Sequence, residues 1–304
     1  MKPIERFLRE TDRMPLMPMP TPLHPMHYQP SGKDVSLLIK RDDMTGVGPG
    51  GNKIRSLEFL LGEARSRGAS KILAAGPEQS NLCALTAAAC AKAGLDCELI
   101  INAAEPARKE GNLLLEELAA AYQSAGEQTY VVRNGATTGR GALGYTAAVV
   151  EMKRQCEDLG IGRMTIFAPG GNGGVAAGLI YGNQLMGQPF RIVIVSVEDD
   201  RETLTAHIRS TISEAEEITG LPMNVPVEQA AEITDAYRGG GWGENTEESQ
   251  QAVLSFARSE GIFIENVYTS KVLVGMMDWI EQEKVSGPVC YLHTGGLGSL
   301  FAQY

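Results

Sequence analysis

Short runs of β-branched residues alternate with longer segments of helical periodicity along most of this chain. Strands separated by helices of this length form βαβ units, in which neighbouring strands are parallel. The predicted strands are Leu37–Lys40, Lys71–Ala75, Cys97–Asn102, Thr129–Arg133, Met164–Ala168, Arg191–Val197 and Val289–His293. The predicted helices are Ile54–Arg67, Asn81–Ala93, Gly111–Ala121, Tyr145–Leu159, Gly174–Met186, Arg201–Thr219, Glu247–Ser259 and Lys271–Glu283. The pattern predicts an α/β protein that binds its ligands beyond the carboxyl ends of the strands.

Length and composition narrow the class of protein. At roughly 150 residues per domain, 304 residues predict two domains, each able to bury its own core. The net charge of −10 argues against nucleic acid or an anionic membrane surface as a partner. No apolar run reaches the ~18 residues of a membrane helix, and the charged N-terminus lacks a signal-peptide core. Five cysteines without CxxC spacing and four histidines without ligand spacing predict a cytoplasmic protein with free thiols and no metal site.

One lysine stands where a glycine-rich loop becomes a helix, in the stretch GPGGNKIRSLEFLLGEA from Gly48 to Ala64. The glycines before Lys53 let the backbone adopt positive φ and let a ligand approach the main chain. The positive end of the helix dipole disfavours a second cation, which lowers the lysine's pKa below its usual ~10.4. A nucleophilic lysine that forms Schiff bases is the functional interpretation. A solvated lysine in a flexible surface loop is the alternative.

A second cluster, GPEQSN from Gly76 to Asn81, lies between a predicted strand and a predicted helix. A helix that opens with Ser80 and Asn81 presents free backbone N–H groups and polar side chains to an anion such as a carboxylate. Ser and Asn also form ordinary N-caps, and the residues alone favour that alternative.

The third cluster, APGGNGGVAAGL from Ala168 to Leu179, follows another predicted strand. Four glycines around Asn172 lead into a helix of small residues, where backbone amides and the helix dipole bind a phosphate. Neither the GxGxxG dinucleotide pattern nor a P-loop fits this stretch. A phosphate site is preferred over a Gly-rich connection without function, because such conformational freedom carries an entropy cost.

The last predicted strand leads into His293, Thr294, Gly295 and Gly296, so a hydroxyl lies at its carboxyl end. His293 by itself is interpreted as a structural histidine. A reactive lysine, a phosphate site and a carboxylate-binding loop together describe pyridoxal 5′-phosphate bound to an amino acid.

These motifs resemble those of the D-cysteine desulfhydrase and 1-aminocyclopropane-1-carboxylate deaminase family, within the tryptophan-synthase-β-like (fold type II) pyridoxal phosphate enzymes. The order and spacing of the motifs hold over nearly the whole chain. The matching stretches are PTPL (Pro20–Leu23), KRDDMTG (Lys40–Gly46), GGNKIRSLEFLL (Gly50–Leu61), QSN (Gln79–Asn81), LGY (Leu143–Tyr145), GNGGVAAGL (Gly171–Leu179), VYTSK (Val267–Lys271) and HTGG (His293–Gly296).

The resemblance implies an α/β fold with two open twisted, mainly parallel sheets flanked by helices. It places the cofactor in the cleft between a large domain of residues 1–48 and 164–304 and a small domain of residues 49–163. It also implies a homodimer.

The resemblance assigns roles to individual residues. Lys53 matches the Schiff-base lysine, Asn81 matches the asparagine that bonds the cofactor's ring hydroxyl, and Thr294 matches a residue beside the pyridine ring. Ser80, as a proton shuttle, and Tyr268 match the other catalytic side chains. The phosphate loop is matched by Gly171, Asn172, Gly173, Gly174 and Val175. The substrate-binding positions are Gln79, Ser80, Asn81, Trp242, Tyr268 and Thr269.

Two positions near the ring help to separate the reactions of the family. Its cyclopropane deaminases carry glutamate where this chain has Thr269 and leucine where it has Thr294, so the two hydroxyls resemble the desulfhydrases. A carboxylate beside the pyridine nitrogen strengthens the electron sink for ring opening, whereas a hydroxyl suffices when a thiolate leaves. The resemblance therefore implies β-elimination from a small β-substituted amino acid, with D-cysteine giving pyruvate, sulfide and ammonia.

Three residues depart from the family pattern. Leu82 stands where relatives place a polar residue, Trp242 where they have tyrosine, and Val175 where they have threonine. Two of these changes are expected to face the substrate, so a lyase for another β-substituted alanine such as cysteate stays open. A 1-aminocyclopropane-1-carboxylate deaminase and a β-replacement synthase stay open as well. A cofactor-binding protein without turnover is the alternative from another class, and the retained catalytic side chains argue against it.

Overall fold

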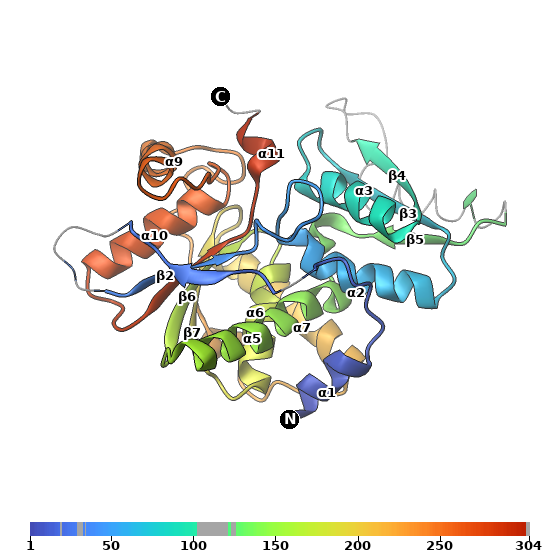
Figure 1. Ribbon diagram of the computed structural model, residues 1–304, viewed down its shortest axis with the longest axis horizontal. Helices are drawn as coiled ribbons and strands as arrows, with labels where there is room; N and C mark the ends of the chain where they lie inside the picture. The colour runs from blue at the N-terminus through green and yellow to red at the C-terminus, as the bar shows by residue number, and fades with distance from the viewer. Residues whose placement is uncertain (19, 29–32, 34, 102–120, 123–125, 302–304) are drawn as a thin grey trace.

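Two α/β units, each built on its own sheet, make up the protein in this computed structural model (Figure 1). The structure describes residues 1–18, 20–28, 33, 35–101, 121–122 and 126–301. The larger sheet has the order β1-β2-β9-β6-β7-β8, in which β1 runs antiparallel to β2 and the other neighbours are parallel. Its strands are β1 (Leu23–Pro25), β2 (Leu37–Arg41), β6 (Met164–Gly170), β7 (Phe190–Ser196), β8 (Glu232–Thr234) and β9 (Val289–His293). The smaller, parallel sheet has the order β4-β3-β5, with β3 (Lys71–Gly76), β4 (Asp96–Ile101) and β5 (Thr129–Val132). The predicted α/β class with two mainly parallel sheets is thus confirmed.

Helices flank both sheets. They are α1 (Pro3–Glu10), α2 (Lys53–Ser66), α3 (Asn81–Ala93), α5 (Gly139–Leu159), α6 (Gly174–Leu185), α7 (Arg201–Thr219), α8 (Val227–Ala230), α9 (Glu247–Glu260), α10 (Thr269–Glu281) and α11 (Leu297–Leu300), with a 3₁₀ turn η1 at Asn134–Ala136. Of the predicted helix Gly111–Ala121 the structure describes Ala121 alone, and Asn102 at the end of a predicted strand is outside the described residues. No helix within the described ranges is both long and apolar enough to cross a bilayer.

The large sheet is buried on both faces because its strands alternate between two cores. Along β7, Ile192 and Ile194 belong to a core shared with α5, α6 and α7, whereas Val193 and Val195 belong to a core shared with α9 and α10. Successive side chains of a strand point to opposite faces, so a continuous apolar run marks a strand that is covered on both sides.

Helix α5 has its main packing partner in the large unit. It packs against α6 in the core of the large sheet, although the sequence places it in the small domain of residues 49–163. Close packing is possible because α6 carries Gly178 and Gly182 at the contact, where an added Cβ would lie 2.2 Å from the carbonyl oxygen of Ala142 and 2.9 Å from Cα of Thr146. Helices α2 and α3, by contrast, cover the small sheet. The helix that ends the predicted small domain therefore belongs to the core of the large sheet.

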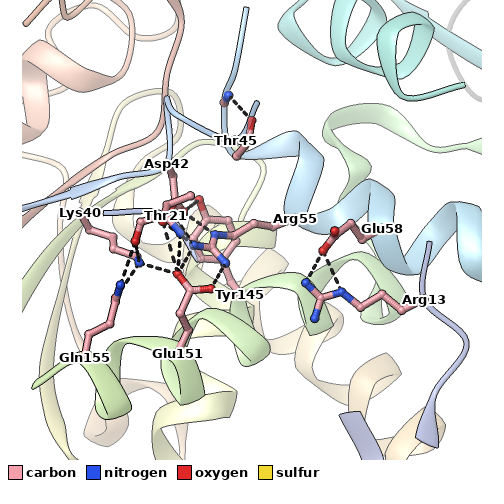
Figure 2. A network of polar contacts seen from close by, with 11 residues as sticks. Arg13, Thr21, Lys40, Asp42, Thr45, Arg55, Glu58, Tyr145, Glu151 and Gln155 are labelled. Atoms are coloured by element: carbon pink, nitrogen blue, oxygen red, sulfur yellow. Dashed lines mark hydrogen bonds and ion pairs between the residues drawn. The ribbon is translucent and has the colours of Figure 1, made fainter. Parts of the chain in front are cut away.

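A buried polar network fastens the first turn of α2 to β2 and α5 (Figure 2). Nε and Nη2 of Arg55 donate to the two carboxylate oxygens of Asp42 at 2.7 and 2.8 Å. Arg55 also donates to Glu151, which pairs with the buried ammonium of Lys40. Burial alone would raise the pKa of Asp42, but the neighbouring guanidinium and ammonium lower it to about 2. The network holds the start of α2, and so Lys53, in a fixed place between the two units.

Candidate active site

A cavity of about 500 Å³ lies between the two units, beyond the carboxyl ends of strands from both sheets. This is where open α/β sheets bind their ligands. The cavity wall brings together these predicted site residues: Lys53, Gln79, Ser80, Asn81, Gly171, Asn172, Gly173, Gly174, Val175, Trp242, Tyr268 and Thr294. Thr269 is the one predicted site residue that the wall does not include.

Lys53 is the first residue of α2, and its amine reaches into the cavity. Its Nζ donates a hydrogen bond of 2.8 Å to the carbonyl oxygen of Gly135. Burial lowers the pKa of Lys53 to about 8, against the opposing effect of the Glu198 carboxylate. The lowered pKa is predicted from the helix dipole, but its main cause in the structure is removal of the amine from water.

The loop before Lys53 passes so close to another loop that Gly50 can carry no side chain. Its φ is +77°, and an added Cβ would lie 1.7 Å from the carbonyl oxygen of Asp43. The glycine is therefore required for a close approach as well as for its left-handed backbone.

The same loop is joined to the end of β9 through main-chain atoms. Gly51 and Gly295 form an isolated antiparallel bridge, and the N–H of Asn52 donates to the carbonyl oxygen of Thr294 at 2.9 Å. Thr294 lines the cavity and is nearly buried. These bonds hold the amine of Lys53 and the hydroxyl of Thr294 on adjoining parts of one wall.

The predicted phosphate loop lies between β6 and α6. Gly173 has a φ of +89° and leads into α6, whose first two residues, Gly174 and Val175, line the cavity. The unpaired N–H groups at the start of this 12-residue helix, together with its dipole, attract an anion. The geometry therefore suits a phosphate group.

The start of α3 forms another polar part of the cavity wall. Ser80 is the N-cap, and its Oγ accepts a hydrogen bond of 3.2 Å from the N–H of Cys83. Gly76 leaves room for this cap, since an added Cβ would lie 2.5 Å from Oγ of Ser80. The N-cap interpretation of this cluster is thus confirmed, and Ser80 and Asn81 line the cavity as well.

An aromatic pair covers one side of the cavity. Nε1 of Trp242 donates a hydrogen bond of 2.7 Å to the hydroxyl oxygen of Tyr268. Burial is the main cause that raises the pKa of Tyr268 to about 12, so its hydroxyl stays protonated at neutral pH. Lys271 tethers the loop of Trp242, because its Nζ donates to the carbonyl oxygens of Arg238 and Gly241 at 2.6 and 2.9 Å.

The hydroxyl of Thr269 is engaged outside the cavity. Thr269 is fully buried, and its Oγ1 donates to a carboxylate oxygen of Glu265 at 2.8 Å. The same carboxylate accepts the N–H groups of Val267, Tyr268 and Thr269 at the start of α10. It is Glu265, four residues earlier, that lines the cavity. A carboxylate therefore lies in the wall where the sequence predicts a threonine hydroxyl.

His293 has the structural role that the sequence predicts for it. Its Nε2 lies 2.9 Å from the carbonyl oxygen of Phe263, and its Nδ1 accepts a hydrogen bond from the N–H of Gly295. Burial lowers the pKa of His293, so the ring stays neutral and keeps this pair of contacts.

Sequence reasoning misses several residues of the wall, among them Glu198, Glu265, Asn134 and Thr137. The signal for two of them is nevertheless present. Glu198 directly follows the predicted strand Arg191–Val197, and Asn134 directly follows Thr129–Arg133. Both positions lie at strand carboxyl ends, where ligand contacts are expected.

The residues present fit pyridoxal phosphate. The amine of Lys53 and the anion site at the start of α6 line the same cavity, together with the polar side chains of Asn81 and Thr294. An added Cβ at Gly171 would lie 3.1 Å from Cε1 of Tyr268, so this glycine keeps the cavity open beside the phosphate loop.

The comparisons with known proteins agree with this geometry. The family model described as pyridoxal-phosphate dependent enzyme matches residues 16–295. A protein of Pyrococcus horikoshii, provisionally named 1-aminocyclopropane-1-carboxylate deaminase, is 34% identical over 97% of this chain and 95% of its own length. A protein of Pyrococcus abyssi with the same provisional name is 31% identical over 98% of this chain and 96% of its own length.

Solved structures show the same fold. The crystal structure of an ACC deaminase homologue superimposes with a TM-score of 0.89 and 31% identity, covering 99% of this chain and 97% of that one. A threonine deaminase of T.th., 15% identical, shares the fold with a TM-score of 0.63 over 97% of each chain. The fold type II architecture is thus confirmed, and the chain belongs to the family of pyridoxal-phosphate dependent enzymes.

Proposed function

We propose that this enzyme catalyses β-elimination from a small β-substituted amino acid, with D-cysteine as the substrate and pyruvate, sulfide and ammonia as products. The observation that carries the proposal is the convergence of Lys53, the phosphate loop and the start of α3 on one cavity. The hydroxyl of Thr294 at the wall supports D-cysteine, because thiolate is a leaving group that needs no carboxylate at the ring.

Pyridoxal phosphate, when bound, supplies the electron sink for the electrons of the substrate's Cα–H bond. The first N–H groups of α6 and the backbone of Gly171 to Val175 would hold its phosphate. Lys53 would carry the cofactor covalently, and Asn81 would bond its ring hydroxyl. Ser80 and Gln79, at the start of α3, would bind the carboxylate of the amino acid.

Proton movement falls to side chains of this cavity. With a pKa of about 8, Nζ of Lys53 is neutral often enough near neutral pH to take the Cα proton. Tyr268 accepts a hydrogen bond from Trp242, which leaves its own O–H free to donate toward the substrate. Ser80 has its oxygen occupied by an N–H of α3 and also keeps its proton for donation.

A second candidate function is deamination of 1-aminocyclopropane-1-carboxylate. It is supported by the carboxylate of Glu265 in the cavity wall and by the provisional names of the Pyrococcus relatives. Four donors already bind this carboxylate at the start of α10, so less of its charge is available to a ring nitrogen than from a free glutamate. This favours D-cysteine as the first choice.

Location and assembly are part of the proposal. A homodimer is expected from the family resemblance, and a cytoplasmic location from the five free cysteines, which are consistent with a reducing compartment. Light scattering of the purified protein at the mass of two chains would support the dimer, and the mass of one chain would contradict it.

The test is an assay of the cofactor-loaded enzyme with D-cysteine, in which pyruvate and sulfide are measured in equal amounts. Formation of 2-oxobutyrate from 1-aminocyclopropane-1-carboxylate would favour the second candidate, and pyruvate from cysteate would favour a different β-substituted alanine. If the bound cofactor's absorbance responds to no amino acid, the chain is a binding protein without turnover and the proposal is wrong.

A further inference from the structure

Glu198 carries a buried carboxylate oxygen that no donor from the described residues reaches. Glu198 follows β7 and lines the cavity. Across the described parts of the chain, no hydrogen-bond partner reaches its Oε2, although this atom is shielded from solvent. A buried acceptor left without a donor costs free energy, so such an atom in a binding cavity points to a donor on the ligand.

The unpaired oxygen lies beside the catalytic groups. An added Cβ at Gly171 would lie 3.7 Å from Oε2 of Glu198 and 3.1 Å from Cε1 of Tyr268, so both side chains border the same point of the wall. Burial lowers the pKa of Lys53 and raises that of Glu198, and each group's charge opposes the other's shift. The carboxylate and the amine therefore share one electrostatic environment.

The part of the ligand that carries the donor can be identified by excluding the other parts in turn. The phosphate and ring oxygen of the cofactor and the α-carboxylate of an amino acid are anionic, and they repel a carboxylate instead of donating to it. The family resemblance places the pyridine ring beside Thr294 at the end of β9, and β6 lies between β9 and β7. The amino nitrogen would be bound to the cofactor. The group that remains is the substituent on the β-carbon.

We propose that Oε2 of Glu198 accepts a hydrogen bond from the β-substituent of the substrate. The inference rests on the proposed function and narrows its substrate class. Glu198 selects alanines whose β-substituent bears a proton on its heteroatom, namely a thiol, a hydroxyl or an ammonium group. It rejects an anionic substituent such as the sulfonate of cysteate, because two negative charges would meet in a shielded cavity. A cyclopropane ring offers no donor and leaves the oxygen unpaired.

The experiment compares the cofactor-loaded wild-type enzyme with Glu198→Gln. The amide keeps the shape of the side chain, removes its charge and can donate to a sulfonate. For both enantiomers of cysteine, 2,3-diaminopropionate and cysteate, kcat/KM is measured from pyruvate, and the dissociation constant is measured from the absorbance change of the bound cofactor. Asp199→Asn is the matched control, since it removes one negative charge from the next residue, which does not line the cavity.

In Glu198→Gln, the preference for cysteine and for 2,3-diaminopropionate over cysteate should fall at least tenfold, through weaker binding of the first two and tighter binding of the third. Asp199→Asn should keep the wild-type preference. An equal loss for all three ligands would show that Glu198 serves Lys53 alone and would overturn the proposal. An unchanged preference, or no binding of any of the three ligands, would overturn it as well. The dissociation constants are measured without turnover. Absence of pyruvate alone would therefore reject the proposed function, and the dissociation constants would still decide this inference.

Discussion

The indole N–H of Trp242 donates a hydrogen bond of 2.7 Å to the hydroxyl oxygen of Tyr268, so one aromatic side chain sets the direction in which the other can donate. The donor belongs to a half-exposed residue on a glycine-rich loop, and the acceptor belongs to the residue before α10. Proton donation by Tyr268 therefore depends on the position of the loop that carries Trp242.

Trp242→Phe keeps an aromatic ring and removes the donor. Without the indole N–H, the hydroxyl of Tyr268 is free to rotate, and its proton is no longer aimed by a partner. We expect kcat/KM for β-elimination to fall about tenfold, which corresponds to the ~1.4 kcal/mol of one hydrogen bond. The other tryptophan supplies the control: Trp279→Phe, on α10 against Phe167 and away from the cavity wall, should leave kcat/KM within about twofold. Equal activity of Trp242→Phe and wild type would contradict the role of this bond.

Lys53→Ala should abolish turnover and the covalent attachment of the cofactor. Borohydride reduction of the loaded wild-type protein, followed by peptide mass spectrometry, should find the added pyridoxyl mass on Lys53. The variant should still take up cofactor noncovalently, because the phosphate site at the start of α6 is intact. An unmodified Lys53 in saturated wild-type protein would remove the basis of every other role assigned here.

The lowered pKa of Lys53 predicts a pH dependence of stability in the cofactor-free protein. The ordinary pKa of 10.5 falls to about 8 on folding, so between these values the unfolded chain binds the extra proton. The free energy of unfolding should therefore increase with pH from about 8 to 10.5. Urea unfolding of wild type and Lys53→Met across this range measures the effect as a difference, which should shrink as the pH rises. If the difference in unfolding free energy between wild type and Lys53→Met does not vary with pH, folding does not lower the pKa of Lys53 and this prediction is wrong.

Arg55→Met should destabilise the protein strongly, because it leaves the buried carboxylate of Asp42 without its guanidinium. Breaking one side of a buried ion pair costs ~3–5 kcal/mol. The exposed pair of Arg209 and Glu228 gives the comparison, and Arg209→Met should cost less than ~1 kcal/mol. Urea unfolding of the cofactor-free variants measures both costs, and similar values would contradict the importance of the network.

Asp42 also predicts the response of this network to acid. Its pKa is lowered from 3.8 to about 2, so its contribution to stability is complete above pH 3.8 and is lost as the pH falls through 2. In Asp42→Asn this part of the acid sensitivity should be absent when unfolding is followed from about pH 5 down to about pH 2.

Gly50→Ala tests the close approach of two loops. The backbone there has a φ of +77°, and the new methyl group would lie 1.7 Å from the carbonyl oxygen of Asp43. Gly68→Ala is the matched control, since its φ of +75° carries the same backbone strain with no atom within 4 Å. The control should cost ~1 kcal/mol of unfolding free energy. Gly50→Ala should lower the free energy of unfolding by more than the control does. It should also lower kcat, because the loop before Lys53 has to move to make room for the methyl group.

Much of the fold and most of the site follow from the sequence for definite reasons. The alternating cores of β7 require a continuous apolar run, and that run is visible as the predicted strand Arg191–Val197. The loops before α2 and α6 can be recognised in the sequence by their glycines, because backbone with positive φ, as at Gly50 and Gly173, strongly favours glycine. The position of α5 is not predicted in this way, since its contact with α6 depends on Gly178 and Gly182, which lie in the next helix and carry no signal in the sequence of α5 itself.

The sequence does not tell which of two nearby polar residues lines the cavity. Thr269 and Glu265 are four residues apart, and the spacing does not tell which of them faces the cavity. The first N–H groups of α10 require acceptors, and the carboxylate of Glu265 supplies them. The same carboxylate accepts the hydroxyl of Thr269, so this hydroxyl does not face the cavity. Glu198 is missed for a different reason: its place after a predicted strand is a signal, but a single acidic residue there forms no recognisable motif.

The bridge between Gly51 and Gly295 and the bond from Asn52 to Thr294 consist of main-chain atoms. A point mutation can exchange the side chain at residue 294 and leave these bonds in place. Residue 294 can thus carry a carboxylate, an alkyl group or a hydroxyl without displacing the adjoining amine of Lys53. A different reaction can therefore arise from a new side chain at residue 294 while the backbone of the site stays the same.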